Sequence, residues 1–209
     1  SNHIMNPYYN DFGSWIRKLF PDFRVQKISI DAGFSCPNRN GRISSGGCIY
    51  CDNRPFNPSY CDRKKSITEQ LVEGKAFFAR KYPDMKYLAY FQAYTNTYGE
   101  LSTLRELYEE ALRQTDVVGI IIATRPDCMP QELLNYLSEL SKTHFVMVEY
   151  GVETSHDATL KLINRGHTWH DVKDAVTRTS AACVLCGAHL ILGLPGEDMA
   201  HFVTTAKRI

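Results

Sequence analysis

Short apolar segments alternate with amphipathic helical patterns along most of this chain, and this alternation restricts its fold more than any other feature. The apolar segments cover 25–32, 87–94, 117–123, 145–152 and 185–194, which are lengths expected of strands. They are apolar on both faces, as parallel strands are when helices cover both sides of a sheet. The pattern predicts an α/β fold with right-handed crossovers. It leaves open whether the sheet is doubly wound, a barrel or part of a barrel; in each case functional groups gather at the C-terminal strand ends.

Capping residues and leucine spacing place the helices. Ser66 with Glu69 forms one capping box and Thr168 with Asp171 forms a second, and helices are expected from these boxes to about residues 82 and 182. Pro130 suits a first helical position. Further helical segments are expected over 102–113, 130–140, 156–164 and 196–209, and 5–23 is expected to form a short helix or arm.

Length and composition indicate a single domain. The chain has 209 residues, of which 44% are hydrophobic and 22% charged, and these values exclude a disordered, collagen-like or coiled-coil protein. A net charge of +1 gives no overall bias toward nucleic acid or membrane. Residues 1–4 precede a methionine and look like an expression scar, so the domain is expected to be 5–209. Its last helical pattern has no strand after it, which predicts a domain that is incomplete at its C-terminal side.

The sequence contains seven cysteines, an odd and high number. No signal peptide opens the chain and no apolar run reaches 18 residues. We therefore expect a cytoplasmic protein with reduced thiols and no membrane association. In that compartment grouped cysteines are more often metal ligands or catalytic groups than disulfides.

Cys36, Cys48 and Cys51 lie in an irregular segment over 33–65 that is rich in glycine and proline. Cys48 and Cys51 are three positions apart, so one turn can direct both sulfurs at a single point. The glycines after Cys36 allow the chain to fold back and add a third sulfur. Three thiolates are one ligand short of a structural zinc site. They suit a [4Fe–4S] cluster in which the fourth iron is open to a cofactor or substrate.

Other interpretations of the cysteines stay open. Cys61 would complete a four-cysteine zinc or iron–sulfur site, and with zinc the chain would be a zinc-stabilised α/β binding module without catalysis. In a further interpretation, the thiols of the cysteine segment bind no metal. Cys183 and Cys186 are expected to be buried packing thiols, with a redox pair, or an auxiliary cluster that recruits Cys61 or Cys128, as alternatives.

An ordered set of motifs accompanies the cysteines, most of them at predicted strand ends. They are DAGFSCPNR (31–39), FQAYTNTY (91–98), ATRPD (123–127), EYGVE (149–153), NRGH (164–167) and HLILGLPGE (189–197). Together with the expanded cysteine spacing, this set resembles the radical SAM superfamily. The resemblance is closest to its YhcC-like branch, which is related to the catalytic subunit of Elongator, and it extends from Tyr8 to Glu197.

The resemblance implies a partial (β/α)6 TIM-like barrel of the radical SAM type, with about five strand–helix units in this chain. It also implies a three-cysteine [4Fe–4S] cluster whose open iron binds S-adenosyl-L-methionine through its amino and carboxylate groups. An external electron donor, flavodoxin- or ferredoxin-like, would drive cleavage of this cofactor to a 5′-deoxyadenosyl radical. That radical abstracts hydrogen from a substrate, which the sequence does not identify.

Further residues are predicted to contact the cofactor. The resemblance implies that Tyr50 packs near the adenine and that the end of the second strand holds the methionyl amino group. Arg125 suits a carboxylate, and Glu153, inside an apolar segment, needs a partner such as Arg165. Each residue also has an ordinary structural interpretation, as loop packing, an ion pair or a satisfied core histidine. The predicted set is Tyr50, Gln92, Thr95, Asn96, Thr124, Arg125, Glu153, Arg165 and His189.

Basic residues gather around the cysteine segment: Arg39, Arg42, Arg54, Arg63, Lys64 and Lys65. The relatives near Elongator act on the wobble uridine of tRNA, so a tRNA-modifying radical SAM enzyme is an alternative function. Basic residues in a solvated loop are also an ordinary protein surface, and a salt-dependent affinity for tRNA would distinguish the two.

Overall fold

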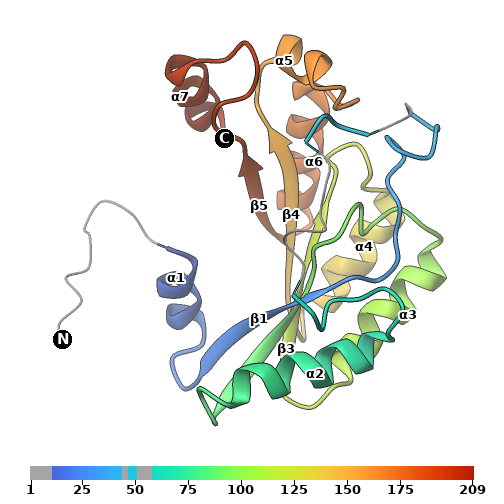
Figure 1. Cartoon of the computed structure of the whole chain (residues 1–209), viewed down its shortest axis with the longest axis vertical. Coiled ribbons are helices and arrows are strands. Elements are labelled where there is room, and N and C mark those ends of the chain that lie inside the picture. The colour runs from blue at the N-terminus through green and yellow to red at the C-terminus, as the bar shows by residue number, and fades with distance from the viewer. Residues whose placement is uncertain (1–10, 44–46, 51–57) are drawn as a thin grey trace, which may run out of the picture.

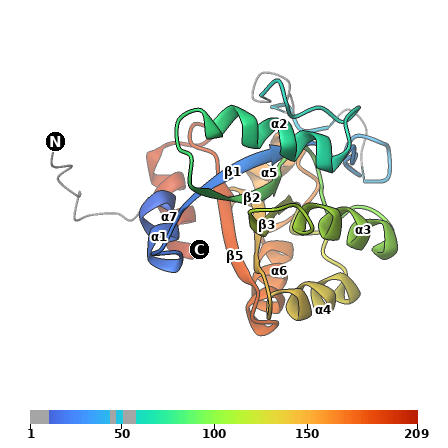
Figure 2. The ribbon, with the colours of Figure 1, turned by 90° about the horizontal axis from the view of Figure 1, so that it is seen from below.

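The computed structural model of the chain describes residues 11–43, 47–50 and 58–209. One sheet of five parallel strands forms its centre, in the order β1-β2-β3-β4-β5. The strands are β1 (Arg24–Ile30), β2 (Met85–Phe91), β3 (Val117–Thr124), β4 (Phe145–Glu153) and β5 (Leu185–Leu190). The sheet curves without closing, so β1 and β5 are its two edges (Figures 1 and 2). The predicted α/β fold is confirmed, in the form of an open part of a barrel.

Helices connect successive strands and cover the outer face of the sheet (Figure 2). The helix α1 (Phe12–Leu19) precedes β1, and α2 (Ile67–Ala79), α3 (Leu101–Leu112) and α4 (Gln131–Leu140) follow the first three strands in turn. The helices α5 (Asp157–Leu162) and α6 (Trp169–Ala181) lie between β4 and β5, and α7 (Met199–Arg208) follows β5. Both predicted capping boxes are present, at the starts of α2 and α6.

Two apolar clusters occupy the two faces of the sheet. The larger lies between the sheet and α2, α3, α4 and α6 and contains Ala89 and Phe91 of β2. The smaller joins Ile16 of α1 to Leu88 and Tyr90 of the same strand. Side chains alternate across a strand, so these two pairs point to opposite faces. The helix α1 covers part of the inner face. Polar side chains at the C-terminal ends of the strands line a cavity.

Several element boundaries differ from the sequence prediction for local reasons. The helix α2 ends at Ala79 because Pro83 lacks a backbone donor and restricts the residue before it. The strand β2 ends at Phe91 because Tyr94 has a left-handed φ of 63°. The strand β5 ends at Leu190, before a turn that contains Gly193 with a φ of 80°. As an edge strand β5 is half exposed, so the expected burial of both faces is wrong for this strand.

Within the described ranges, no helix combines the length and the apolar character needed to cross a bilayer.

Candidate functional site

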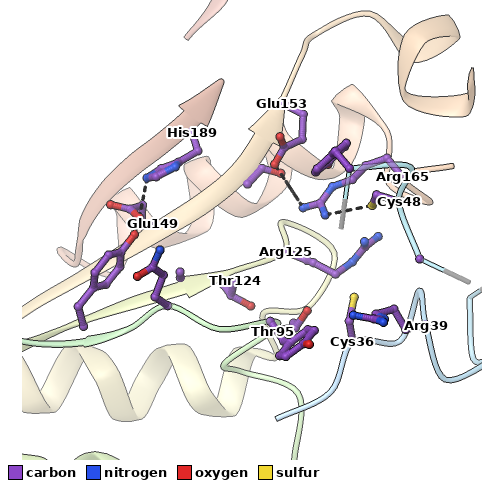
Figure 3. Close-up of a pocket in the computed structure, with 17 residues that line it drawn as sticks. Cys36, Arg39, Cys48, Thr95, Thr124, Arg125, Glu149, Glu153, Arg165 and His189 are labelled. Carbon is purple, nitrogen blue, oxygen red and sulfur yellow. Dashed lines mark hydrogen bonds and ion pairs between the residues drawn. The ribbon is translucent and has the colours of Figure 1, made fainter. Parts of the chain in front are cut away.

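A cavity of about 240 Å³ opens at the C-terminal ends of the strands (Figure 3). Most of the predicted site residues line it, although they come from segments far apart in the sequence. They are Cys36, Cys48, Tyr50, Gln92, Thr95, Thr124, Arg125, Glu153, Arg165 and His189. Asn96 is not among the lining residues, and Cys51 lies outside the described residues. The fold therefore gathers around one cavity ten of the twelve residues that the sequence predicted.

Two of the three predicted cluster ligands contribute buried thiols to this cavity. Cys36 and Cys48 are 7% and 8% exposed. Cys36 begins a helical turn, because its carbonyl oxygen accepts hydrogen bonds from the backbone amides of Arg39 and Asn40. The chain then returns and places Cys48 on the wall of the same cavity. Ligation of a cluster by these thiols stays a prediction, because Cys51 belongs to a part of the chain without a described structure.

The other described cysteines lie away from this cavity. Cys61 packs in the larger apolar cluster, and burial raises the pKa of its thiol to about 12. Cys128 lines a second cavity of about 600 Å³ beside the cysteine segment. Cys186 is half buried, but Cys183 is exposed in the tight turn before β5, with a φ of 57°. The prediction of two buried packing thiols is therefore wrong for Cys183. Among the residues with a described structure, no group of three or more His, Cys, Asp or Glu side chains forms a metal site.

Arg165 is buried and connects the cysteine segment to β4. Its Nη2 donates to the carbonyl oxygen of Gly151 at 2.9 Å and lies 3.9 Å from Oε1 of Glu153. Its Nη1 lies 3.7 Å from Sγ of Cys48. A Cβ at Gly151 would come within 2.7 Å of the guanidinium, so a larger residue here would displace Arg165 from its present position. Burial raises the pKa of Glu153, and the nearby Arg165 opposes that rise. The partner that Glu153 was expected to need is therefore present.

Arg125 places a second buried cation in the cavity wall. It is 2% exposed, and its Nε and Nη2 donate to the two oxygens of Asp127 at 2.8 and 3.0 Å. Burial by itself would raise the Asp127 pKa, but the hydrogen bonds from Arg125 hold it below its usual value. The Nη1 of Arg125 is buried and has no hydrogen-bond partner among the described residues. A buried donor of this kind, on a residue that lines the cavity, favours an anionic ligand.

Glu149 and His189 form an ion pair on the opposite side of the cavity, as Figure 3 shows. The Nε2 of His189 lies 2.6 Å from Oε1 of Glu149, and the Tyr90 hydroxyl donates to the same carboxylate. The strands β2, β4 and β5 thus each supply one member of a hydrogen-bonded group. His189 is exposed and paired, and it is not the satisfied core histidine that its position in an apolar run suggested.

The end of β2 supplies a polar wall. The Oε1 of Gln92 accepts a hydrogen bond from the Ser29 hydroxyl at 3.0 Å, and the Thr124 hydroxyl lies 2.6 Å from that of Thr97. Thr95 is buried and lines the cavity. Asn96 lies behind this wall, where its Nδ2 donates to the carbonyl oxygen of Ala123 at 2.9 Å and ties β2 to β3. In this structure Asn96 supports the wall and does not form its surface.

Four lining residues with charged or aromatic side chains were absent from the predicted set: Arg39, Tyr90, Tyr94 and Glu149. Two of them carried a usable signal, because side chains at alternate positions of a strand share a face. Tyr90 is two positions before Gln92, and Glu149 is four positions before Glu153. The other two enter through irregular backbone. Tyr94 has a left-handed φ, and Arg39 lies in the turn that Cys36 begins, so no periodic pattern marks either residue.

The pair of Glu149 and His189 predicts a defined pH dependence of stability. Burial alone would raise the Glu149 pKa, but hydrogen bonds from His189 and Tyr90 lower it from the usual 4.5, and Glu149 raises the His189 pKa from the usual 6.5. The carboxyl group stabilises the fold above about pH 4.5 and loses this effect as the pH falls. The imidazolium stabilises it below about pH 6.5 and loses this effect as the pH rises.

We therefore expect the wild type to exceed His189→Gln in melting temperature most strongly between these two values, with a smaller difference at about pH 8. Thermal unfolding of both proteins across this range measures the difference. His170→Gln, which changes an exposed histidine of α6, serves as the control and is expected to follow the wild type at every pH. A difference between wild type and His189→Gln that does not vary with pH would contradict the pairing.

Comparison with known proteins identifies relatives of this chain. A sequence model described as the radical SAM superfamily matches residues 40–209. YtqA of Bacillus subtilis is 39% identical over 201 residues, which are 96% of this chain and 62% of YtqA. YhcC of Escherichia coli K12 is 38% identical over 96% of this chain and 63% of its own length. The chain thus spans about three fifths of the length of these relatives. A tRNA uridine(34) acetyltransferase of Methanocaldococcus jannaschii is 34% identical over 82 residues, or 39% of this chain and 15% of its own.

Solved structures show the same fold at lower sequence identity. The archaeal Elp3 of Methanocaldococcus infernus superposes with a TM-score of 0.61 at 19% identity, over 88% of this chain and 42% of its own. The radical SAM enzyme coproporphyrinogen III oxidase of Escherichia coli superposes with a TM-score of 0.52 at 16% identity, over 96% of this chain and 44% of its own. The family match and the relatives above 30% identity agree with the cysteine segment and the strand-end cavity: the chain belongs to the radical SAM superfamily.

Proposed function

We propose that this chain is the core of a radical SAM enzyme in which Cys36, Cys48 and Cys51 hold a [4Fe–4S] cluster and the adjoining cavity binds S-adenosyl-L-methionine. The observation that carries the proposal is the meeting of two buried thiols and two buried arginines in one cavity at the C-terminal strand ends. When bound, the cluster and cofactor supply a 5′-deoxyadenosyl radical that abstracts hydrogen from a substrate. The electron is expected from an external donor of the flavodoxin or ferredoxin type.

The donor set fits these groups. Thiolates are the protein ligands of iron–sulfur clusters, and a cluster with three of them carries net negative charge. Arg125, with its Nη1 free of a hydrogen-bond partner among the described residues, and Arg165 supply compensating positive charge in a buried wall. Carboxylate groups of a cofactor are bound by arginine in the same way. Glu153 beside Arg165 and Glu149 on the opposite side provide acceptors for amino or hydroxyl groups.

The chain's own residues then have separable roles. Arg165 orients the cysteine segment against β4 through its contacts with Cys48 and Gly151. Tyr50 lines the cavity and is 39% exposed, so its ring can reach a bound cofactor. The apolar clusters on the outer and inner faces of the sheet keep water from one side of the cavity. Exclusion of water protects a radical from side reactions.

Anaerobic turnover tests the proposal. The wild-type protein, reconstituted with iron and sulfide, is expected to bind about four irons per chain and to release 5′-deoxyadenosine when given S-adenosyl-L-methionine and dithionite. Copurified zinc in place of iron, with no 5′-deoxyadenosine, would support the zinc-stabilised binding module and contradict the enzyme. Cys61 would then have to be a zinc ligand, and its burial in the larger apolar cluster disfavours that role.

A second candidate function, modification of tRNA, is favoured by stacked cations beside the cysteine segment, of which Arg39 lines the cavity and Arg42 lines the neighbouring cavity of about 600 Å³. The guanidinium carbons of Arg39 and Arg63 each lie 5.3 Å from the ring centre of Tyr94, and that of Arg42 lies 5.6 Å from Tyr98. We call these five residues the cationic rim. Arginine and tyrosine side chains of this kind stack on unpaired RNA bases and meet phosphates. The name of one relative, tRNA uridine(34) acetyltransferase, points to the same class of substrate.

The other basic residues near the cysteine segment differ from the rim. Lys64 and Lys65 stack on no aromatic ring within the described ranges, and Lys65 is paired with Glu73 at 2.6 Å. Arg63 of the rim is paired with Asp31 at 3.6 Å but keeps its contact with Tyr94. Arg54 lies outside the described residues. The rim residues are therefore the ones to vary in a binding test.

We expect Arg42→Ala and Arg63→Ala each to weaken the binding of unmodified tRNA and to reduce the slope of log K against log salt by about 1. The measurement is a filter-binding or fluorescence titration at several salt concentrations. Lys18→Ala, on an exposed position of α1, is the charge-matched control and is expected to leave affinity and slope unchanged. Equal losses in the control and the rim variants would remove tRNA as a specific partner.

A further inference from the structure

The thiol of Cys48 has a second buried partner besides Arg165, the side chain of Asn38. Asn38 is fully buried, two positions after Cys36, and its Nδ2 lies 3.4 Å from Sγ of Cys48. The same Nδ2 donates to the main-chain carbonyl oxygen of Asn164 at 2.6 Å. One amide nitrogen therefore links the segment after β1, the second cysteine and the turn after α5.

The surroundings fix the orientation of this amide. A carbonyl oxygen at 2.6 Å can face only the N–H side of a carboxamide, because two oxygens at that distance would repel each other. With one hydrogen of Nδ2 directed at Asn164, the other is available to the Cys48 sulfur. The opposite assignment of the amide would place its oxygen against both an oxygen and a thiolate. The N–H···S contact thus follows from the backbone around it.

The chain has built a close-fitting site for this contact. The backbone oxygen of Asn38 accepts from the amide of Gly47, and the side chain of Asn164 donates to the carbonyl oxygen of Gly47 at 2.9 Å. Gly166 adopts a φ of 85°, and a Cβ at this position would lie 3.0 Å from Oδ1 of Asn38. Glycine is therefore required where the turn over 164–167 approaches the amide. The segment that carries Cys48 is held between Asn38 and this turn.

We infer that Asn38 is a positioning residue that tunes the cluster, by donating an N–H···S hydrogen bond to the Cys48 thiolate; this inference rests on the proposed function. A hydrogen bond to a ligating sulfur withdraws negative charge from it. The reduced cluster carries one more negative charge than the oxidised cluster, so the bond stabilises the reduced state more. Asn38 therefore raises the reduction potential and makes delivery of the electron easier.

Redox titration of the reconstituted wild type, Asn38→Leu and Asn135→Leu tests this inference, with the midpoint potential read from the EPR signal of the reduced cluster. Leucine has a similar shape to asparagine and lacks the N–H donor, so the midpoint potential is expected to shift to a more negative value. Asn135→Leu is the matched control, because it makes the same change at an exposed position of α4 that does not line the cavity. Its midpoint potential is expected to equal that of the wild type.

Asn38→Ser, which is too short to span both partners, is the second variant and is expected to shift the midpoint potential in the same direction as Asn38→Leu. An unchanged potential in both Asn38 variants overturns the inference, and so does an equal shift in Asn135→Leu. Failure of both Asn38 variants to retain iron, while Asn135→Leu retains it, assigns the amide a role in assembly only and also overturns tuning. A wild type that binds no cluster contradicts the proposed function itself, and iron content distinguishes that outcome from the others.

Discussion

Replacement of Cys48 by alanine is expected to reduce the iron bound after anaerobic reconstitution from about four per chain to near background, because two thiolates do not hold a [4Fe–4S] cluster with an open iron. In the same variant, release of 5′-deoxyadenosine should fall to the rate measured without enzyme. Cys48 is buried in the cavity wall, so its thiol has a defined place in the proposed site. Iron analysis, the absorbance of the cluster and chromatography of the nucleoside measure these effects.

Cys183→Ala provides the matched control for this variant. It makes the same chemical change at an exposed cysteine in the turn before β5, and it is expected to retain both the iron and the activity of the wild type. Cys61→Ala extends the comparison, since this thiol packs in the larger apolar cluster. Its expected effect is a modest loss of stability with the cluster retained. Loss of iron in Cys61→Ala but not in Cys48→Ala would refute the assignment of the ligands.

Replacement of Arg165 by methionine is expected to have the largest effect on stability. The change leaves Glu153 buried without its cation and removes the donors to Gly151 and His167. Breaking one side of a buried ion pair typically costs about 3–5 kcal/mol. Chemical denaturation at neutral pH measures the free energy of unfolding. Because burial raises the Glu153 pKa, its carboxyl group takes up a proton readily, and the loss should be smaller in mildly acidic buffer.

A double variant separates charge burial from lost packing. Addition of Glu153→Gln to Arg165→Met removes the isolated carboxylate and is expected to recover a substantial part of the lost stability. If the double variant is no more stable than Arg165→Met, the cost lies in packing and in the bonds to Gly151 and His167. The pairing of Arg165 with Glu153 would then contribute little to the fold.

The buried, neutral state of His167 supports a role of Arg165 in the stability of the fold. The Nδ1 of His167 accepts a hydrogen bond from Nε of Arg165 at 3.0 Å. Burial, together with the nearby arginines, lowers the pKa of the ring to about 3. A neutral ring is required here because an imidazolium would have no lone pair for this bond. The NRGH motif (164–167) thus combines a left-handed asparagine, a buried cation, a glycine contact and a neutral acceptor in four consecutive residues.

Periodic features of the sequence predicted most of the fold. The apolar segments correspond to β1–β5, and the two capping boxes correspond to the starts of α2 and α6. The differences occur where single residues leave regular geometry. Tyr94, Glu153 and Cys183 all have positive φ values, and each lies at or near the end of an element. Positive φ for a residue other than glycine depends on tertiary contacts, so no propensity indicates it in advance.

The sequence by itself determined the order of strands and helices, the cysteine spacing and the polar character of the strand ends, because each of these depends on neighbours along the chain. The sequence also suggested Arg165 as the partner of Glu153, but only the tertiary structure decided the other meetings of polar groups. It joined His189 of β5 to Glu149 of β4, Arg165 to Cys48, and Asn38 to the turn after α5. These contacts depend on strand register and on close approach at glycine, which fix distances between residues more than 100 positions apart in some cases. Local sequence patterns do not specify such distances.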